Sequence, residues 1–336
     1  MTRAVRAGMD FVSALDRGSL GGLARLCAPG ATWWVDTGPD RRGGDPDLAP
    51  TGSGRFPLHG VLRMDDKLAL MRDLGPTAFP TGCRQIPRRI VAGDDWCVIE
   101  VEGYGVHASG LEYANRYGFV FDVDPSGAVV SVREYLDTIH AQQVVGGGEP
   151  VPRSSLDAPA ARPDRYPGPD EPAARPAPDP GDAPPAVTTA LAMWPALAGG
   201  DLDAFGALFT EDATWWTDTG RNRDLGRPHR RGDIDANGPF HGTVTITAKL
   251  AAMRARLATG GYRSAAVTVT PHRWIADDTL VAVEASGDAT LADGSRYQNR
   301  YLWVVDVRAD GIAGVREYCD TLHIADLMGY HAEVGR

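Results

Sequence analysis

The pattern of hydrophobic and polar residues runs through the same series of predicted elements twice along the chain. An apolar residue at every third or fourth position predicts a first helix, and a short aromatic strand, a long polar loop and a second helix follow it. Four stretches that alternate between apolar and polar residues then predict strands joined by short turns. Helices that precede an antiparallel meander are typical of an α+β domain, so we expect each half to fold as one.

The predicted elements occupy matching positions in the two halves. In the first half they are the helix Met9–Leu26, the strand Thr32–Val35, the loop Thr37–Pro57, the helix Met64–Leu74 and the strands Arg84–Ile90, Trp96–Tyr104, Leu111–Val123 and Val129–Thr138. In the second half they are the helix Leu191–Phe209, the strand Thr214–Thr217, the loop Thr219–Pro239, the helix Thr247–Leu257 and the strands Ala265–Trp274, Leu280–Ala289, Ser295–Val307 and Gly311–Thr321. Asp201 has the side chain and the position expected of an N-cap for residues 202–209.

Four sequence motifs also recur in the same order, 182 to 184 residues apart. They are Trp33-Trp34 followed by Asp36-Thr37-Gly38, His59-Gly60, Tyr113-x-Asn115-Arg116-Tyr117 and Arg133-Glu134-Tyr135-x-Asp137-Thr138-x-His140. Their second copies begin at Trp215, His241, Tyr297 and Arg316. A period this long exceeds the roughly 20–50 residues of a solenoid unit, so the motifs indicate tandem duplication of a whole domain.

A proline-rich segment separates the two copies. Twelve of the 25 prolines lie between Pro150 and Pro185, and few large apolar residues accompany them. Such a segment cannot bury enough apolar surface to fold, and about forty residues span on the order of 40 Å. We therefore predict a first domain at residues 1–145, a linker at 146–186 and a second domain at 187–336. The linker length allows an internal pseudo-dimer of the two repeats, with further homo-oligomerisation possible.

Composition narrows the environment and the partners. The formal net charge of −10 argues against binding to a nucleic-acid backbone, which requires clustered lysine and arginine. No apolar run reaches the length of a membrane helix, and the first residues lack the apolar stretch of a secretory signal. The four cysteines show no C-x-x-C spacing, which favours reduced thiols in the cytoplasm over disulfides or a zinc site.

The repeated motifs place aromatic and polar side chains together on single strand faces. One face, on the predicted strand Leu111–Val123, consists of Tyr113, Asn115, Tyr117 and Phe119, matched by Tyr297, Asn299, Tyr301 and Trp303. A face of the last strand consists of Arg133, Tyr135 and Asp137, matched by Arg316, Tyr318 and Asp320. Aromatic walls with a few polar groups are typical of a ligand pocket. The opposite face of the last strand, with Val132, Glu134 and Leu136, is expected to meet helices, solvent or the partner domain.

The order of elements, the Ala31-Thr32-Trp33-Trp34 strand and the terminal Arg-Glu-Tyr-x-Asp-Thr-x-His strand resemble the nuclear transport factor 2-like superfamily. Within it, the chain is most similar to the SnoaL-like, ketosteroid-isomerase-related branch, and the resemblance covers both copies. It implies two cone-shaped α+β barrels, each with helices packed in a curved antiparallel sheet around a deep apolar cavity. It also implies either cofactor-free acid–base chemistry on small, often polycyclic molecules or plain binding of such molecules.

The resemblance suggests roles for several repeated residues. A last-strand Asp acts as a base in SnoaL-like cyclases and related epoxide hydrolases, and Asp137 and Asp320 lie in a similar place. An Asp closes the first strand of steroid isomerases, and Asp36 and Asp218 resemble it. The candidate catalytic residues are Asp137, Asp320, His59, His241, Asp36, Asp218, Tyr135 and Tyr318. The candidate substrate-binding residues are Trp34, Trp216, Tyr113, Tyr297, Asn115, Asn299, Tyr117, Tyr301, Arg133, Arg316, His140 and His323.

Each candidate also has a structural interpretation. The last-strand Asp could bond an Arg or a backbone amide, His140 could cap the C-terminal segment, and Asn115 could be a satisfied core amide. No His/Asp/Glu spacing typical of a metal site occurs, so no metal is expected. The resemblance implies that no other cofactor is needed.

These residues predict an enzyme that cyclises, isomerises or hydrolyses a small natural-product-like molecule by acid–base catalysis. The alternatives are a non-catalytic protein that sequesters such a molecule, and a pair of domains in which only one is catalytic. The same Asp and His in both copies favour catalysis, because pure binding would require only the aromatic walls.

Overall fold

The computed structural model describes residues 1–35, 60–145, 183–217, 242–258, 268–290, 294, 296–321 and 324. The chain divides into two compact units, one formed by Met1–Glu171 with Asp320–Arg336 and the other by Pro172–Cys319. The two long loops, most of the proposed linker and the candidates Asp36, Asp218, His59, His241 and His323 lie outside the described residues.

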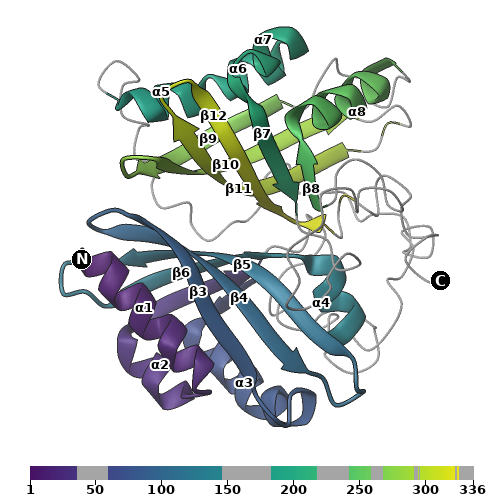
Figure 1. Ribbon diagram of the computed structural model, residues 1–336. Helices are drawn as coiled ribbons and strands as arrows, with labels where there is room; N and C mark the ends of the chain where they lie inside the picture. The colour runs from purple at the N-terminus through teal and green to yellow at the C-terminus, as the bar shows by residue number, and fades with distance from the viewer. Residues whose placement is uncertain are drawn as a thin grey trace. The chain divides into compact units, whose positions relative to one another are not determined.

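The first unit contains a six-stranded sheet with helices on one face (Figure 1). Its elements are α1 (Arg3–Asp16), α2 (Leu20–Leu26), β1 (Cys27–Val35), β2 (Gly60–Arg63), α3 (Met64–Ala78), β3 (Cys83–Ala92), β4 (Trp96–Val106), β5 (Glu112–Val123), β6 (Val129–Leu136) and α4 (Thr138–Val145). The strand order is β2-β1-β6-β5-β4-β3. The α+β class is confirmed, but the sheet is mixed and not wholly antiparallel, because β1 pairs with β6 in parallel.

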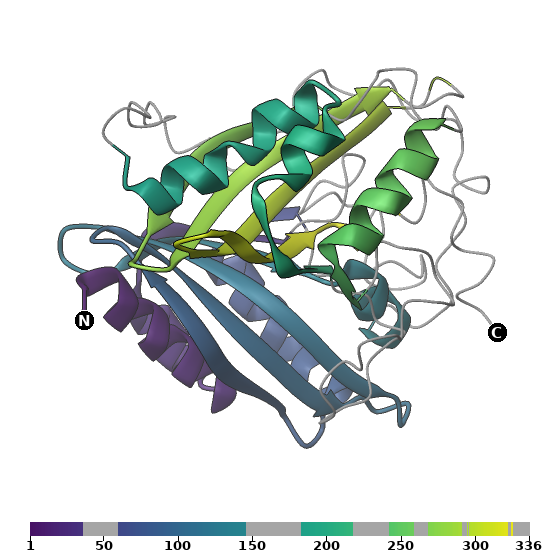
Figure 2. The same cartoon turned by 45° about the horizontal axis from the view of Figure 1, so that its top comes forward.

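The second unit repeats this architecture, and its helices α5–α8 also cover one face of its sheet (Figure 2). Its elements are α5 (Pro185–Leu191), α6 (Met193–Ala198), α7 (Leu202–Gly206), β7 (Phe209–Thr217), β8 (Gly242–Thr245), α8 (Ile246–Ala258), β9 (Thr268–Ala276), β10 (Leu280–Thr290), β11 (Arg296–Arg308) and β12 (Gly311–Cys319). The order β8-β7-β12-β11-β10-β9 is that of the first sheet, with β7 parallel to β12. Two sheets of one topology are consistent with duplication of a domain.

The core of the first unit lies between α1 and the sheet. Phe11 packs its ring 5.2 Å from that of Trp33 and 5.3 Å from that of Phe121. Gly8 allows the close approach of α1 to β4 and β5, because a Cβ at this position would lie 2.8 Å from Ile99 Cδ1 and 2.9 Å from Phe121 Cδ2. This packing positions Trp33, which lines a cavity in this unit.

The first predicted helix of each half is divided in the structure. The helix predicted at Met9–Leu26 is wrong in detail, because Gly18 adopts a left-handed conformation (φ 61°) that separates α1 from α2. The helix predicted at Leu191–Phe209 is likewise divided among α5, α6 and α7, with Gly200 at φ 68° after α6. The predicted cap is confirmed, because Ala204 N donates to the Asp201 carboxylate over 2.9 Å.

The end of the first repeat also differs from the prediction. The strand predicted at Val129–Thr138 ends at Leu136, and Thr138 begins helix α4. Among the described residues, no helix is long and apolar enough to span a membrane.

Candidate active site

A cavity of about 560 Å³ opens between the helices and the sheet of the first unit. Its apolar walls include Leu15, Leu20, Trp33, Met71, Phe79 and Phe119. The polar side chains that line it include Lys67, Cys83, Gln85, Tyr113, Tyr117 and Glu134. An apolar hollow with a few convergent polar groups is the usual form of a small-molecule site.

The register of the sheet decides which face of β6 meets this cavity. Phe119 pairs directly with Glu134, and Tyr117 pairs with Leu136. Directly paired residues in an antiparallel ladder project to the same face, so Glu134 shares the cavity side with the β5 aromatic residues. The prediction that Arg133, Tyr135 and Asp137 face this pocket is therefore wrong for the first unit.

Glu134 forms a compact cluster with Lys67 of α3 and Trp33 of β1. The indole Nε1 of Trp33 donates to Glu134 Oε2 over 2.7 Å, and Lys67 Nζ lies 3.8 Å from the same oxygen. Lys67 Nζ also lies 4.8 Å from the centroid of the Trp33 ring, a distance typical of a cation–π contact. We call these three residues the Trp-Lys-Glu cluster.

Burial shifts both titratable groups of this cluster toward their neutral forms. Loss of hydration raises the pKa of Glu134, while Lys67 and then the indole N–H oppose the shift. Loss of hydration lowers the pKa of Lys67 to about 8, and here the Glu134 charge opposes the shift. The two shifts reduce the free-energy cost of moving a proton between the cluster and a bound molecule near neutral pH.

The predicted face of β5 does reach the cavity. Tyr117 donates its hydroxyl proton to the Tyr113 oxygen over 2.8 Å, and both rings line the wall. Burial raises the pKa of both phenols, so they remain protonated hydrogen-bonding groups. In the second unit the Tyr297 and Tyr301 hydroxyls are likewise hydrogen-bonded to each other.

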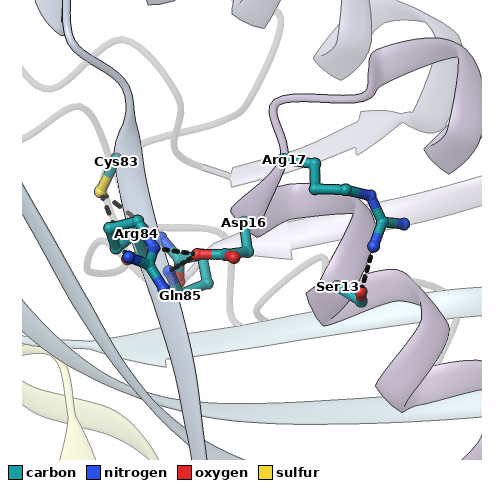
Figure 3. Close-up of polar contacts among 6 residues, drawn as sticks. All are labelled: Ser13, Asp16, Arg17, Cys83, Arg84 and Gln85. Carbon is teal, nitrogen blue, oxygen red and sulfur yellow. Dashed lines mark hydrogen bonds and ion pairs between the residues drawn. The ribbon is translucent and has the colours of Figure 1, made fainter.

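Polar contacts brace the cavity rim where α1 meets β3 (Figure 3). The Asp16 carboxylate accepts from Gln85 N and from Arg84 Nε, each over 2.8 Å, and these bonds lower the pKa of Asp16. Gln85 Nε2 also lies 3.5 Å from the sulfur of Cys83. Burial raises the pKa of the Cys83 thiol to about 12, so it is not a thiolate nucleophile near neutral pH.

The second unit contains the same cluster. Trp215 Nε1 donates to Glu317 Oε2 over 2.6 Å, and Lys249 Nζ lies 3.4 Å from that oxygen and 4.7 Å from the Trp215 ring centroid. Glu317 accepts a further bond of 3.0 Å from the hydroxyl of Thr217, where the first repeat has Val35. In the register of β11 and β12, Glu317 pairs with Trp303, just as Glu134 pairs with Phe119 in the first unit.

The sequence contains a signal for this cluster that lies outside the repeated motifs. Of the 34 lysines and arginines, only Lys67 and Lys249 are lysines, and they are 182 residues apart, like Trp33 and Trp215. Both are buried, with exposed fractions of 2% and 5%. Arginine occupies all the remaining positions in this set, so each repeat has one lysine, and it lies at this position.

Residues 190–315 match the family model described as the SnoaL-like domain. This confirms the predicted resemblance for the second repeat, and the common sheet order and the shared Trp-Lys-Glu cluster are consistent with a first repeat of the same kind. Among curated proteins, none matches the chain significantly.

Several solved structures are similar to slightly less than half of the chain. An NTF2-like protein of unknown function from Burkholderia pseudomallei K96243 has 17% identity over 43% of this chain and 98% of its own, with a TM-score of 0.35. TerC, co-crystallised with polyporic acid, has 15% identity over 44% and 99%, with a TM-score of 0.34. IdmH from Streptomyces antibioticus, proposed to be a polyketide cyclase, has 17% identity over 44% and 99%, with a TM-score of 0.33.

Asp137 caps a helix in this structure. Its Oδ1 accepts from His140 N, three residues into α4, over 3.2 Å, which is N-cap geometry. The same oxygen accepts from the Thr321 hydroxyl over 2.6 Å, and the Thr138 hydroxyl donates to Asp320 Oδ1 over 2.5 Å. All of these residues belong to the first compact unit, which includes Asp320–Arg336. Asp137 is fully buried and is not part of the cavity lining.

Asn115 and His140 support this cap. Asn115 Nδ2 donates to the Asp137 carbonyl oxygen over 3.0 Å, and Asp137 N donates back to Asn115 Oδ1 over 3.1 Å. His140 Nε2 accepts from Ala114 N over 3.0 Å, and its ring stacks on Tyr113 at 5.3 Å. Asn299 is buried and its Nδ2 donates to Tyr297 over 3.3 Å. These contacts agree with the structural interpretation of the motif.

We predict that Asp137→Ala lowers the free energy of unfolding by about 1–3 kcal/mol, because it removes a cap and leaves buried donors without an acceptor. Asp137→Asn should cost much less, since an asparagine oxygen also caps helices. Urea unfolding followed by circular dichroism measures both. Equal stability of Asp137→Ala and the wild type would contradict the capping role.

Trp34, Tyr135 and Arg133 of the first unit are not part of the cavity lining, and their second-unit counterparts make matching contacts. Trp34 packs edge-on against Tyr135 with ring centroids 5.1 Å apart, and Trp216 does the same with Tyr318 at 5.2 Å. Arg133 Nη1 donates to Asp122 over 2.7 Å. Arg316 pairs with Val304 in the second sheet. The tryptophan that lines the cavity is thus Trp33 and not the predicted Trp34.

Across the ranges that the structure describes, no three His, Cys, Asp or Glu side chains come together in a way that could hold a metal ion.

Proposed function

We propose that this protein is a cofactor-independent acid–base enzyme that acts on a small, largely apolar, natural-product-like molecule. The observation that supports it most directly is a carboxylate, Glu134, placed with an amine and an indole N–H in an apolar cavity of about 560 Å³. Cyclisation, isomerisation and epoxide opening all require a proton to be removed from, or delivered to, one substrate atom. Glu134 and Lys67 can perform both tasks.

Each group has a defined part in this proposal. The Glu134 carboxylate accepts a proton from a carbon or hydroxyl of the substrate, and its raised pKa makes it a stronger base than an exposed glutamate. Lys67 and Trp33 hold the carboxylate in place through Oε2, and Lys67 balances its charge. The hydroxyls of Tyr113 and Tyr117 lie on the same wall and are available to hydrogen-bond a polar substrate atom.

The proposal is tested with 5-nitrobenzisoxazole, a flat apolar molecule that opens when a base removes one proton from carbon. The wild-type protein should turn it over with saturation kinetics, and the rate should be unchanged by EDTA. Competition by a tightly bound apolar dye would show that the reaction occurs in the cavity. Dye binding without turnover of the probe would support the sequestering protein in place of the enzyme.

We further propose that the two repeats form an internal pseudo-dimer in the cytoplasm. All four cysteines are free, as expected in a reducing compartment. A specific protease site inserted at the middle of residues 146–186 should allow cleavage into two fragments that still elute together from gel filtration. Separate elution of the fragments at micromolar concentration would contradict the association.

A further inference from the structure

Lysine is not the residue expected at positions 67 and 249 if these side chains only formed structural ion pairs. Arginine is better suited than lysine to a buried pair with a carboxylate, because its planar guanidinium offers a fixed fork of donors. This chain uses arginine for its other basic positions, including the buried Arg133 that pairs with Asp122. An amine at position 67 therefore points to chemistry that a guanidinium cannot perform.

We propose that Lys67 is a nucleophilic amine that condenses with aldehydes or ketones bound in the cavity and forms an imine. The inference rests on the proposed function only in requiring that a ligand enters this cavity. It adds a covalent site and a substrate class, small apolar carbonyl compounds, to the acid–base groups.

The surroundings of Lys67 fit this reaction. The Lys67 side chain extends from α3 into the cavity lining and is only 2% exposed, beside the indole of Trp33, in a cavity that Met71 and Phe79 also line. Glu134 Oε2 lies 3.8 Å from Nζ, within reach of a proton transfer after a small side-chain movement. Burial also lowers the pKa of Lys67 to about 8, so a substantial fraction of the amine is neutral in mildly alkaline solution.

The reaction balances with groups that are present. Glu134 accepts a proton from the Lys67 ammonium, and the neutral amine attacks the carbonyl carbon. The C–N bond forms as the carbonyl π pair moves to oxygen, and the proton lost by nitrogen passes to that oxygen. The protonated Glu134 then donates its proton to the hydroxyl, the C–O bond breaks and water leaves. The product is the protonated imine (iminium) of Lys67 beside the regenerated Glu134 carboxylate, and hydrolysis reverses the reaction.

The test uses benzaldehyde with sodium cyanoborohydride, which reduces an imine to a stable benzyl-amine. Only Lys67, Lys249 and the N-terminal amine of the full chain can react, so peptide mapping by mass spectrometry assigns each label. At pH 7.5 we expect Lys67 to be benzylated at least about tenfold faster than Nα-acetyl-lysine amide, because more of its amine is neutral. Lys249→Arg should leave this label in place, and Glu134→Gln should slow it.

Labelling of the N-terminal amine with none at Lys67 would overturn the inference. Because Lys67→Arg could disturb the fold, the decisive measurement is made on the wild-type protein, and Lys67→Met with circular dichroism serves as the blank. The outcome is independent of the acid–base proposal. Turnover of 5-nitrobenzisoxazole without a label at Lys67 overturns the imine alone, whereas a label without turnover overturns the acid–base proposal alone.

Discussion

Replacing Glu134 by glutamine should lower the turnover of 5-nitrobenzisoxazole by about 10²–10⁴-fold, the range expected when a general base is removed. The amide has nearly the same shape and still accepts a hydrogen bond from Trp33, so the cavity should keep its volume. What it loses is the ability to take up a proton. The dissociation constant of a cavity-bound dye should change by no more than about tenfold, since charge contributes little to binding an apolar molecule.

The two repeats allow an internal comparison for this prediction. Glu317→Gln makes the same change in the second unit, where Thr217 gives the carboxylate an additional donor. If both repeats are active, each single variant keeps about half of the turnover and the double variant loses it. If only the first is active, Glu317→Gln has no effect.

Glu112→Gln, at an exposed position of β5, is the matched control and should retain full activity. Asp137→Asn tests the alternative base that the sequence suggests. A loss with Asp137→Asn as large as that with Glu134→Gln would contradict the site proposed here.

The stability of the wild-type protein relative to Lys67→Met should increase by about 2 kcal/mol between about pH 8 and pH 10. The folded-state pKa of Lys67 is lowered to about 8, whereas a lysine in the unfolded chain titrates near 10.4. Within this window the unfolded state binds more protons, so raising the pH favours the folded state. Below about pH 7 both states hold the proton and the relative stability should be constant.

Urea unfolding of both proteins at several pH values between 7 and 10 measures this difference in free energy. Both proteins contain the same tyrosines and cysteines, so the titration of those groups contributes equally to both and cancels from the difference. Arg84→Met removes an exposed cation from the same unit and should give a difference that does not vary over this range. A flat difference for Lys67→Met would mean that Lys67 stays charged in the folded protein, and that its amine is not available for the chemistry proposed above.

The sequence by itself determined the order of elements and the face of β5 that carries Tyr113 and Tyr117, and it indicated the duplication. These features follow from local periodicity and from residues that recur at a fixed offset, and they need no knowledge of distant contacts. The Asp201 cap was also predictable, because a cap depends on neighbouring residues only. The matched lysines were visible in the sequence too, although repeated motifs alone do not draw attention to single residues.

Only the tertiary structure decided which face of β6 meets the cavity. Alternation divides a strand into two faces but does not say which one is inward, and the pairing of Phe119 with Glu134 settles it. The same register turns Tyr135 toward Trp34 and leaves Asp137 to cap α4. Trp33, Lys67 and Glu134 come from β1, α3 and β6, and their meeting at one carboxylate oxygen depends on packing between elements that are far apart in the sequence.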